Sequence, residues 1–157
     1  MFPLLFVLNI DHCPKLELPC LPSLKNLYVR GCNNELLRSI SGFCGLTTLT
    51  LYGGNEITSF PDGMLRNLTC LQNLVVYLPK LKELPIEPFG LVMEHLTIDD
   101  CNELESLPEQ IWEDGIRHLT TLDVLSILGC PTLMERCKEG TGEDWDKISH
   151  IPKKEIY

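Results

Sequence analysis

The stretch Met93-Glu-His-Leu96-Thr-Ile98-Asp-Asp-Cys101 decides how this chain folds, because close variants of it recur along most of the sequence. Each copy starts with Leu or Met, has Leu three residues later and an aliphatic residue two places after that. Four copies then reach a cysteine. The copies start at residues 5, 24, 46, 71, 93 and 122. Repetition at intervals of 19 to 29 residues predicts a stack of similar units rather than one irregular core.

Within each copy, the pattern Leu-x-x-Leu-x-Ile alternates apolar and other residues, which is typical of a short strand with one buried face. β-branched residues occupy the middle of four copies: Val29, Val76, Ile98 and Ile127. The following Cys-x-x-Leu-x-x-Leu-Pro segment ends the strand, since proline cannot donate to a ladder. We therefore expect one strand in each unit, followed by a loop or about one turn of helix.

A single unit of this kind cannot bury its own leucines, whereas stacked units bury them against each other. Each buried Leu or Ile contributes about 1.5–3 kcal/mol relative to exposure. Six parallel strands at about 4.8 Å form a ladder only about 25–30 Å long. The pattern thus predicts an α/β solenoid: a short arc with a parallel strand ladder on its concave face and an irregular convex side.

We assign residues 1–137 to the repeats and residues 138–157 to a capping tail, in which Trp145 is expected to lie against the last strand. No comparable cover precedes the first unit, so Leu4, Leu5 and Phe6 are expected to face water, as in a piece of a longer protein. The longest interval, from 93 to 122, contains two convex-like segments. We interpret it as a unit that has lost its strand, which predicts no regular strand from Trp112 to His118.

Composition narrows the class of protein. The chain has 157 residues, 44% of them hydrophobic and 22% charged, which suits one globular domain. A formal charge of −9 argues against a nucleic-acid partner. No apolar run reaches the roughly 20 residues that span a bilayer. The apolar N-terminus lacks the basic start and small-residue cleavage site of a signal peptide, so we interpret it as the first unit.

Eight cysteines raise the question of disulfides. Four of them occupy the same repeat position, one in each unit: Cys13, Cys32, Cys101 and Cys130. Metal ligands and disulfide partners must converge on one point, and no Cys-x-x-Cys pair is present. We therefore predict buried, reduced thiols that pack as small apolar groups, which indicates an intracellular, cytoplasmic location.

The remaining strand positions stand side by side on the open, concave face, where aromatic and arginine residues favour protein contacts. The candidate protein-contact residues are Tyr28, Arg30, Tyr52, Tyr77 and Asp99. The alternative is that these are ordinary solvated strand residues, since tyrosine suits strands in any case.

The sequence predicts no enzyme, catalytic residue, cofactor or metal site. The histidines are scattered at His12, His95, His118 and His150, and none has a nucleophile at a motif spacing. Neighbouring residues on a strand point to opposite faces, so Asp99 and Asp100 are expected to be a solvated turn rather than an acid/base pair. The acidic stretch around Trp145, with Glu143, Asp144 and Asp146, is likewise expected to be solvated.

The repeat resembles the leucine-rich repeat, and three segments narrow the resemblance: Cys-Pro-Lys-Leu at 13–16, Leu-Glu-Ser-Leu-Pro-Glu at 104–109 and Gly-Cys-Pro-Thr-Leu at 129–133. They look like plant intracellular disease resistance proteins with a nucleotide-binding module. The ending, with Arg136-Cys-Lys, Gly142-Glu-Asp-Trp145 and His150-Ile-Pro152, resembles the extreme C-terminus of the coiled-coil class of these receptors. The resemblance covers essentially the whole chain.

This resemblance implies a non-enzymatic recognition module from the sensing and autoinhibitory end of such a receptor. The partner would be a pathogen effector, a guarded host protein or the receptor's own nucleotide-binding module. The phosphate-binding Gly-x-x-x-x-Gly-Lys-Ser/Thr loop and the coiled coil of the family are missing from this sequence. Two alternatives are a substrate-recognition module of a ubiquitin ligase adaptor, whose repeats are more regular, and an extracellular ectodomain, which usually carries Asn at the cysteine position.

Overall fold

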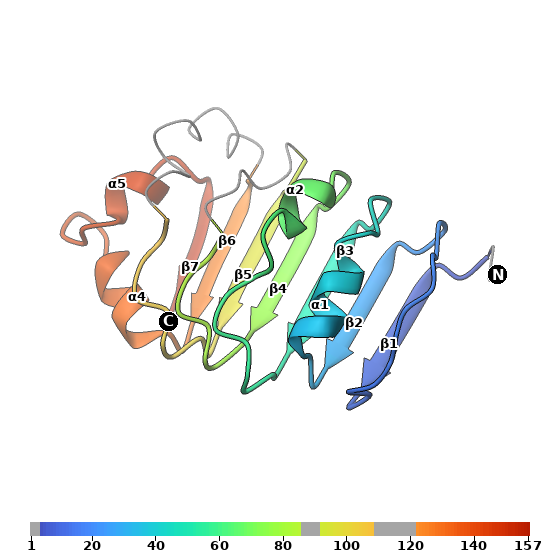
Figure 1. The fold of residues 1–157 in the computed structure, drawn as a ribbon. Helices are drawn as coiled ribbons and strands as arrows, with labels where there is room; N and C mark the ends of the chain where they lie inside the picture. Colours follow the sequence, from blue (N-terminus) through green and yellow to red (C-terminus); the bar gives the residue numbers. More distant parts are fainter. Residues whose placement is uncertain (1–3, 86–91, 109–121) are drawn as a thin grey trace.

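The chain forms one parallel sheet in which the strands follow each other in sequence order, β1 to β7, as Figure 1 shows. The computed structural model describes residues 4–85, 92–108 and 122–157. The strands are β1 (Val7–Asp11), β2 (Asn26–Arg30), β3 (Thr48–Tyr52), β4 (Asn73–Tyr77), β5 (His95–Asp99), β6 (Val124–Leu128) and β7 (Lys153–Ile156). The leucine-rich-repeat solenoid predicted from the sequence is confirmed.

Each of the six predicted units supplies one strand that starts two residues after the unit's first Leu or Met. The strands pair without offset, so equivalent leucines lie in one continuous row: Leu8, Leu27, Leu49, Leu74, Leu96 and Leu125. A second row runs two residues further along each strand, from Ile10 to Ile127. All members of both rows except Leu8 are buried, and they form the strand side of the core.

Four short helices complete the described part of the chain: α1 (Asn34–Ile40), α2 (Met64–Asn67), α4 (Pro131–Arg136) and α5 (Trp145–Ile148). Helices α1 and α2 lie on the same side of the sheet, leaving the other face open (Figure 1). Helix α1, with seven residues, is longer than the single turn that we expected, because the side chain of Asn33 accepts a hydrogen bond from the Leu36 N–H and caps its first turn. None of the described helices has the length and apolar character of a bilayer-spanning segment.

A left-handed backbone residue ends five of the strands. Gly31, Gly53 and Gly129 have φ angles of 72°, 66° and 60°, and His12 and Asp100 adopt 48° and 46° at the equivalent position. Glycine takes this conformation without steric cost, whereas other residues are strained in it. In four units the residue after this turn is the cysteine of the repeat, and it is buried in three of them.

Three of the four repeat cysteines, Cys13, Cys101 and Cys130, bond the carbonyl group of the last residue of the preceding strand. The Sγ atom of Cys130 lies 3.2 Å from the Leu128 carbonyl oxygen, and that of Cys101 lies 3.5 Å from the Asp99 carbonyl oxygen. All eight cysteines of the chain are free, as predicted. Burial is confirmed for Cys32, Cys101 and Cys130 but was wrongly expected for Cys13, which is exposed because its unit has a neighbour on one side only. Burial also raises the pKa of Cys32 to about 12, so this thiol is a packing group rather than a nucleophile.

The ends of the ladder differ. Leu4 and Phe6, beside β1, are 77% and 51% exposed, as expected, whereas Leu5 is partly buried against the core. At the other end the tail supplies a strand that we did not predict: β7 pairs with β6 from Val124 to Ile127. Trp145 lies under the amine of Lys154, which is 5.3 Å from the ring centroid and belongs to β7. The proposed strand loss at Trp112–His118 falls outside the described residues, and β5 pairs directly with β6.

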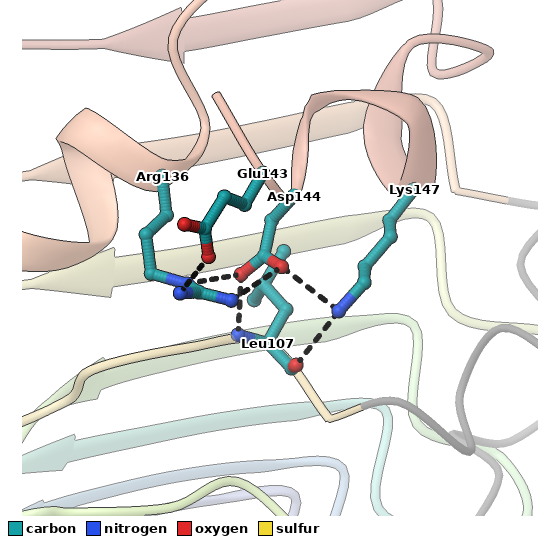
Figure 2. A network of polar contacts seen from close by, with 5 residues as sticks. All are labelled: Leu107, Arg136, Glu143, Asp144 and Lys147. Atoms are coloured by element: carbon teal, nitrogen blue, oxygen red, sulfur yellow. Dashed lines mark hydrogen bonds and ion pairs between the residues drawn. The ribbon is translucent and has the colours of Figure 1, made fainter. Parts of the chain in front are cut away.

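A buried carboxylate holds the tail against the preceding unit (Figure 2). We expected Asp144 to be solvated, but it is 0% exposed. Its Oδ2 atom accepts hydrogen bonds from the Arg136 Nε and the Leu107 N–H, each at 3.1 Å, and its Oδ1 atom lies 2.8 Å from the Lys147 Nζ. Arg136 also pairs with Glu143. These contacts join α4, α5 and the Leu107 corner, and we call them the Asp144 clamp.

The clamp keeps Asp144 ionised. Burial raises the pKa of this carboxyl, but the hydrogen bonds from Arg136, Lys147 and the Leu107 N–H outweigh burial, so the pKa lies below its usual value. A buried carboxylate with these partners is stable only as long as all of them remain in place.

We expect Asp144→Asn to destabilise the fold by roughly 3 kcal/mol, because the substitution leaves Arg136 and Lys147 without their buried counter-charge. Urea denaturation followed by circular dichroism measures the free energy of unfolding. The matched control is Asp146→Asn on α5, where the side chain is exposed. Its effect should stay within about 0.5 kcal/mol. Equal effects of the two substitutions would contradict the clamp.

The clamp also predicts a pH dependence. Because the folded pKa of Asp144 is below the unfolded value, its contribution is complete above about pH 5 and is lost as the pH falls through the folded pKa. The difference in unfolding free energy between the natural chain and Asp144→Asn should therefore be constant from pH 5 to 7 and shrink below pH 4. Urea melts at a series of pH values test this. A difference that grows on acidification would mean that the sign is wrong.

Candidate functional site

The open face of the sheet carries the residues that we predicted as contacts. The register puts Arg30 beside Tyr52 and Tyr52 beside Tyr77, on β2, β3 and β4. Tyr28 lies two residues before Arg30 on the same strand, and Asp99 ends β5 next to β4. The structure therefore brings all five candidates together on four consecutive strands.

The three tyrosine rings form a continuous stack across the strands. The ring centroids of Tyr28 and Tyr52 are 5.3 Å apart with an interplanar angle of 32°. Those of Tyr52 and Tyr77 are also 5.3 Å apart, with an angle of 23°. Such pairs contribute about 0.5–1.5 kcal/mol beyond their buried area. Because the rings support each other, the stack is a preformed surface that loses little side-chain entropy on binding.

Arg30 lies at one end of the stack. It is exposed, and its Nη2 atom is 3.5 Å from the Tyr28 hydroxyl. That hydrogen bond, followed by the charges of Tyr28 and Asp11, raises the pKa of Arg30 above its usual value, so the guanidinium is always charged. Arg30 is the one arginine or lysine on strands β1 to β6.

Beside the stack, the carboxyl ends of β2, β3 and β4 surround a hollow of about 550 Å³. Arg30, Tyr52 and Tyr77 form part of its wall, and Gly53 and Gly54 lie on its rim. In four other units the second of these positions carries the cysteine of the repeat. A Cβ atom on Gly54 would come within 2.6 Å of the Cys32 carbonyl oxygen, so the turn can only be built here with glycine.

Two carboxylates mark the other end of the stack. Burial, followed by the neighbouring Asp100, raises the pKa of Asp99 above its usual value. Asp100 accepts a hydrogen bond from the Tyr77 hydroxyl, and this bond is the main cause of the raised pKa of Tyr77. Our expectation that Asp99 and Asp100 are only a solvated turn missed this bond. The signal in the sequence was that Asp100 stands where three other turns carry glycine.

The histidines of the described residues lie in separate places. His12 bonds Asp11 at 2.5 Å, His95 bonds Asn73 at 2.7 Å, and burial lowers the pKa of His150. His118 lies outside the described residues. Across the described part of the chain, no three His, Cys, Asp or Glu side chains are close enough to hold a metal ion.

The known proteins to which this chain is similar are disease resistance proteins of plants. The chain is 36% identical over 184 residues to the putative disease resistance protein RGA4 of Solanum bulbocastanum, a match that covers 99% of this chain and 18% of the relative. It is 35% identical to RGA1 of the same plant, with the same coverage. A shorter match, 40% identical over 57 residues, covers 36% of this chain and 6% of the disease resistance protein RPP8 of Arabidopsis thaliana. The chain thus spans about a fifth of the length of its first relatives. No protein-family model and no solved structure matches it.

The bond between Tyr77 and Asp100 predicts a measurable shift. In Asp100→Asn the charged acceptor is removed, and the pKa of Tyr77 should fall towards the usual tyrosine value. Asparagine tolerates the left-handed backbone of this turn, so the fold should be retained. NMR of the ring carbons of labelled tyrosine follows each titration separately. Tyr28 serves as the internal reference, and an unchanged Tyr77 titration would show that Asp100 is not its partner.

Proposed function

Because this chain is homologous over 99% of its length to a segment of plant disease resistance proteins, we propose that it is a protein-recognition module acting in defence against pathogens. The observation that carries the proposal is the preformed stack of Tyr28, Tyr52 and Tyr77 next to Arg30 on the open face of a leucine-rich-repeat ladder. Aromatic and arginine side chains are the groups that contribute most to protein interfaces.

The partner that we propose is a pathogen effector, a guarded host protein or a nucleotide-binding module of a full-length receptor. The module would act by binding rather than by catalysis and would need no cofactor. All eight cysteines are free, which supports a reducing compartment and therefore a cytoplasmic location. The relatives described above are all named as disease resistance proteins, which favours this proposal over a substrate-recognition module of a ubiquitin ligase.

The proposal predicts that the binding of partners depends on Tyr52, whose ring contacts both other tyrosines. To test this, the chain is fused to a biotin ligase, which labels nearby proteins, and expressed in leaf cells with and without infection. The labelled proteins are identified by mass spectrometry. The Tyr52→Ala variant should no longer label the proteins that the natural chain labels specifically. Purified partners should bind this variant about tenfold or more weakly, since central aromatic residues often contribute 2 kcal/mol or more.

The matched control is Tyr157→Ala, which removes an equally large ring that is 73% exposed and lies outside the stack. This variant should keep the neighbours of the natural chain. If both variants label the same proteins as the natural chain, the open face is not the contact surface.

A further inference from the structure

The open face has a charge polarity along the strand order. Arg30 lies on β2, the rings of Tyr52 and Tyr77 lie on β3 and β4, and Asp99 lies on β5. A positive group and a negative group are thus separated by two aromatic rings. Neighbouring parallel strands are about 4.8 Å apart, so the two charged positions are about 14 Å apart.

Neither Arg30 nor Asp99 forms an ion pair within the described part of the chain, although the charge of Asp11 contributes to the raised pKa of Arg30. The hydrogen-bond partner of Arg30 there is the Tyr28 hydroxyl, at 3.5 Å. Asp11, the next residue in the same row, is bonded to His12 at 2.5 Å. Among the described residues, no lysine or arginine forms an ion pair with Asp99 or with Asp100.

Other charged groups near the face do not remove this polarity. Glu56 lines the same hollow as Tyr52 and Tyr77 and is exposed, and it lies in the turn after β3 rather than on a strand. On β7, Lys153 and Glu155 pair with each other at 2.8 Å. A partner that covers the row therefore buries one unpaired cation and one unpaired carboxylate. Burial of a charge without a counter-charge is strongly unfavourable, so a partner that brings a group of opposite charge to each pole is favoured.

We propose that the face recognises an extended protein segment that crosses the strands and carries an acidic and a basic side chain four residues apart. The acidic group pairs with Arg30, the basic group pairs with Asp99, and a side chain between them packs on Tyr52 and Tyr77. The spacing follows from geometry, because an extended chain rises about 3.3 Å per residue and needs about four residues to cover 14 Å. This inference rests on the proposed function and specifies the partner of the same face.

In the test, peptides that bind the immobilised chain are selected from a phage-displayed library of random linear decapeptides. Peptides are then counter-selected on a charge-exchanged variant that combines Arg30→Asp with Asp99→Arg. The exchange leaves the net charge unchanged, so differences in binding do not arise from overall electrostatic attraction. Circular dichroism and thermal unfolding establish that the variant is folded. The single variants Arg30→Gln and Asp99→Asn provide a second measurement with smaller changes.

We expect enriched peptides with opposite charges four residues apart. Each should lose about tenfold or more in affinity for the charge-exchanged variant and regain it when the two peptide charges are also exchanged. Each single variant should weaken the same peptides. Arg38→Gln, on α1 away from the face, is the matched control and should have no effect.

Two other results would overturn the inference. In the first, the peptides lose binding to Tyr52→Ala but carry no such charge pair, or bind the charge-exchanged variant as well as the natural chain. The inference about the charges would then be wrong, and the proposed contact surface would be retained. Enrichment of no peptide that depends on Tyr52 would count against the inference and against the contact surface together.

Discussion

The in-register stacking of one unit on the next is the constraint on which the rest of the structure depends. Two rows of aliphatic residues, through Leu49 and through Leu51, run across the strands and are buried only because each unit covers its neighbour. A shift of one residue in any strand would turn its apolar side chains to the open face. The pattern of the core therefore determines which side chains meet outside it.

The same constraint produces the candidate site. Tyr52 and Tyr77 are 25 residues apart in the sequence, yet their rings are 5.3 Å apart because their strands pair without offset. Residues at these positions make no contribution to the core, so the ladder tolerates different side chains there. A recognition surface on this scaffold can change its chemistry without changing the fold.

The repeating features of the fold could be predicted from the sequence, whereas its non-repeating features could not. The strand starts and the meeting of Tyr28, Tyr52 and Tyr77 follow from unit spacing alone. Strand β7 was missed because Lys153 to Ile156 has no leucine pattern, and its pairing is visible only once β6 is placed. The burial of Asp144 was missed for a related reason. One of its partners is a backbone N–H at Leu107, and no local pattern in the tail predicts that contact.

The two edges of the ladder differ in how they meet water. Next to β1, Leu4 and Phe6 expose apolar groups beside an unpaired strand edge. At β7 the edge strand carries Lys153 and Lys154, and edge lysines discourage further strand pairing. The Asp144 clamp joins α4 and α5 to the Leu107 corner of the preceding unit through polar contacts. The geometry of this ionic network is fixed because Arg136, Lys147 and the Leu107 N–H together satisfy the buried carboxylate of Asp144.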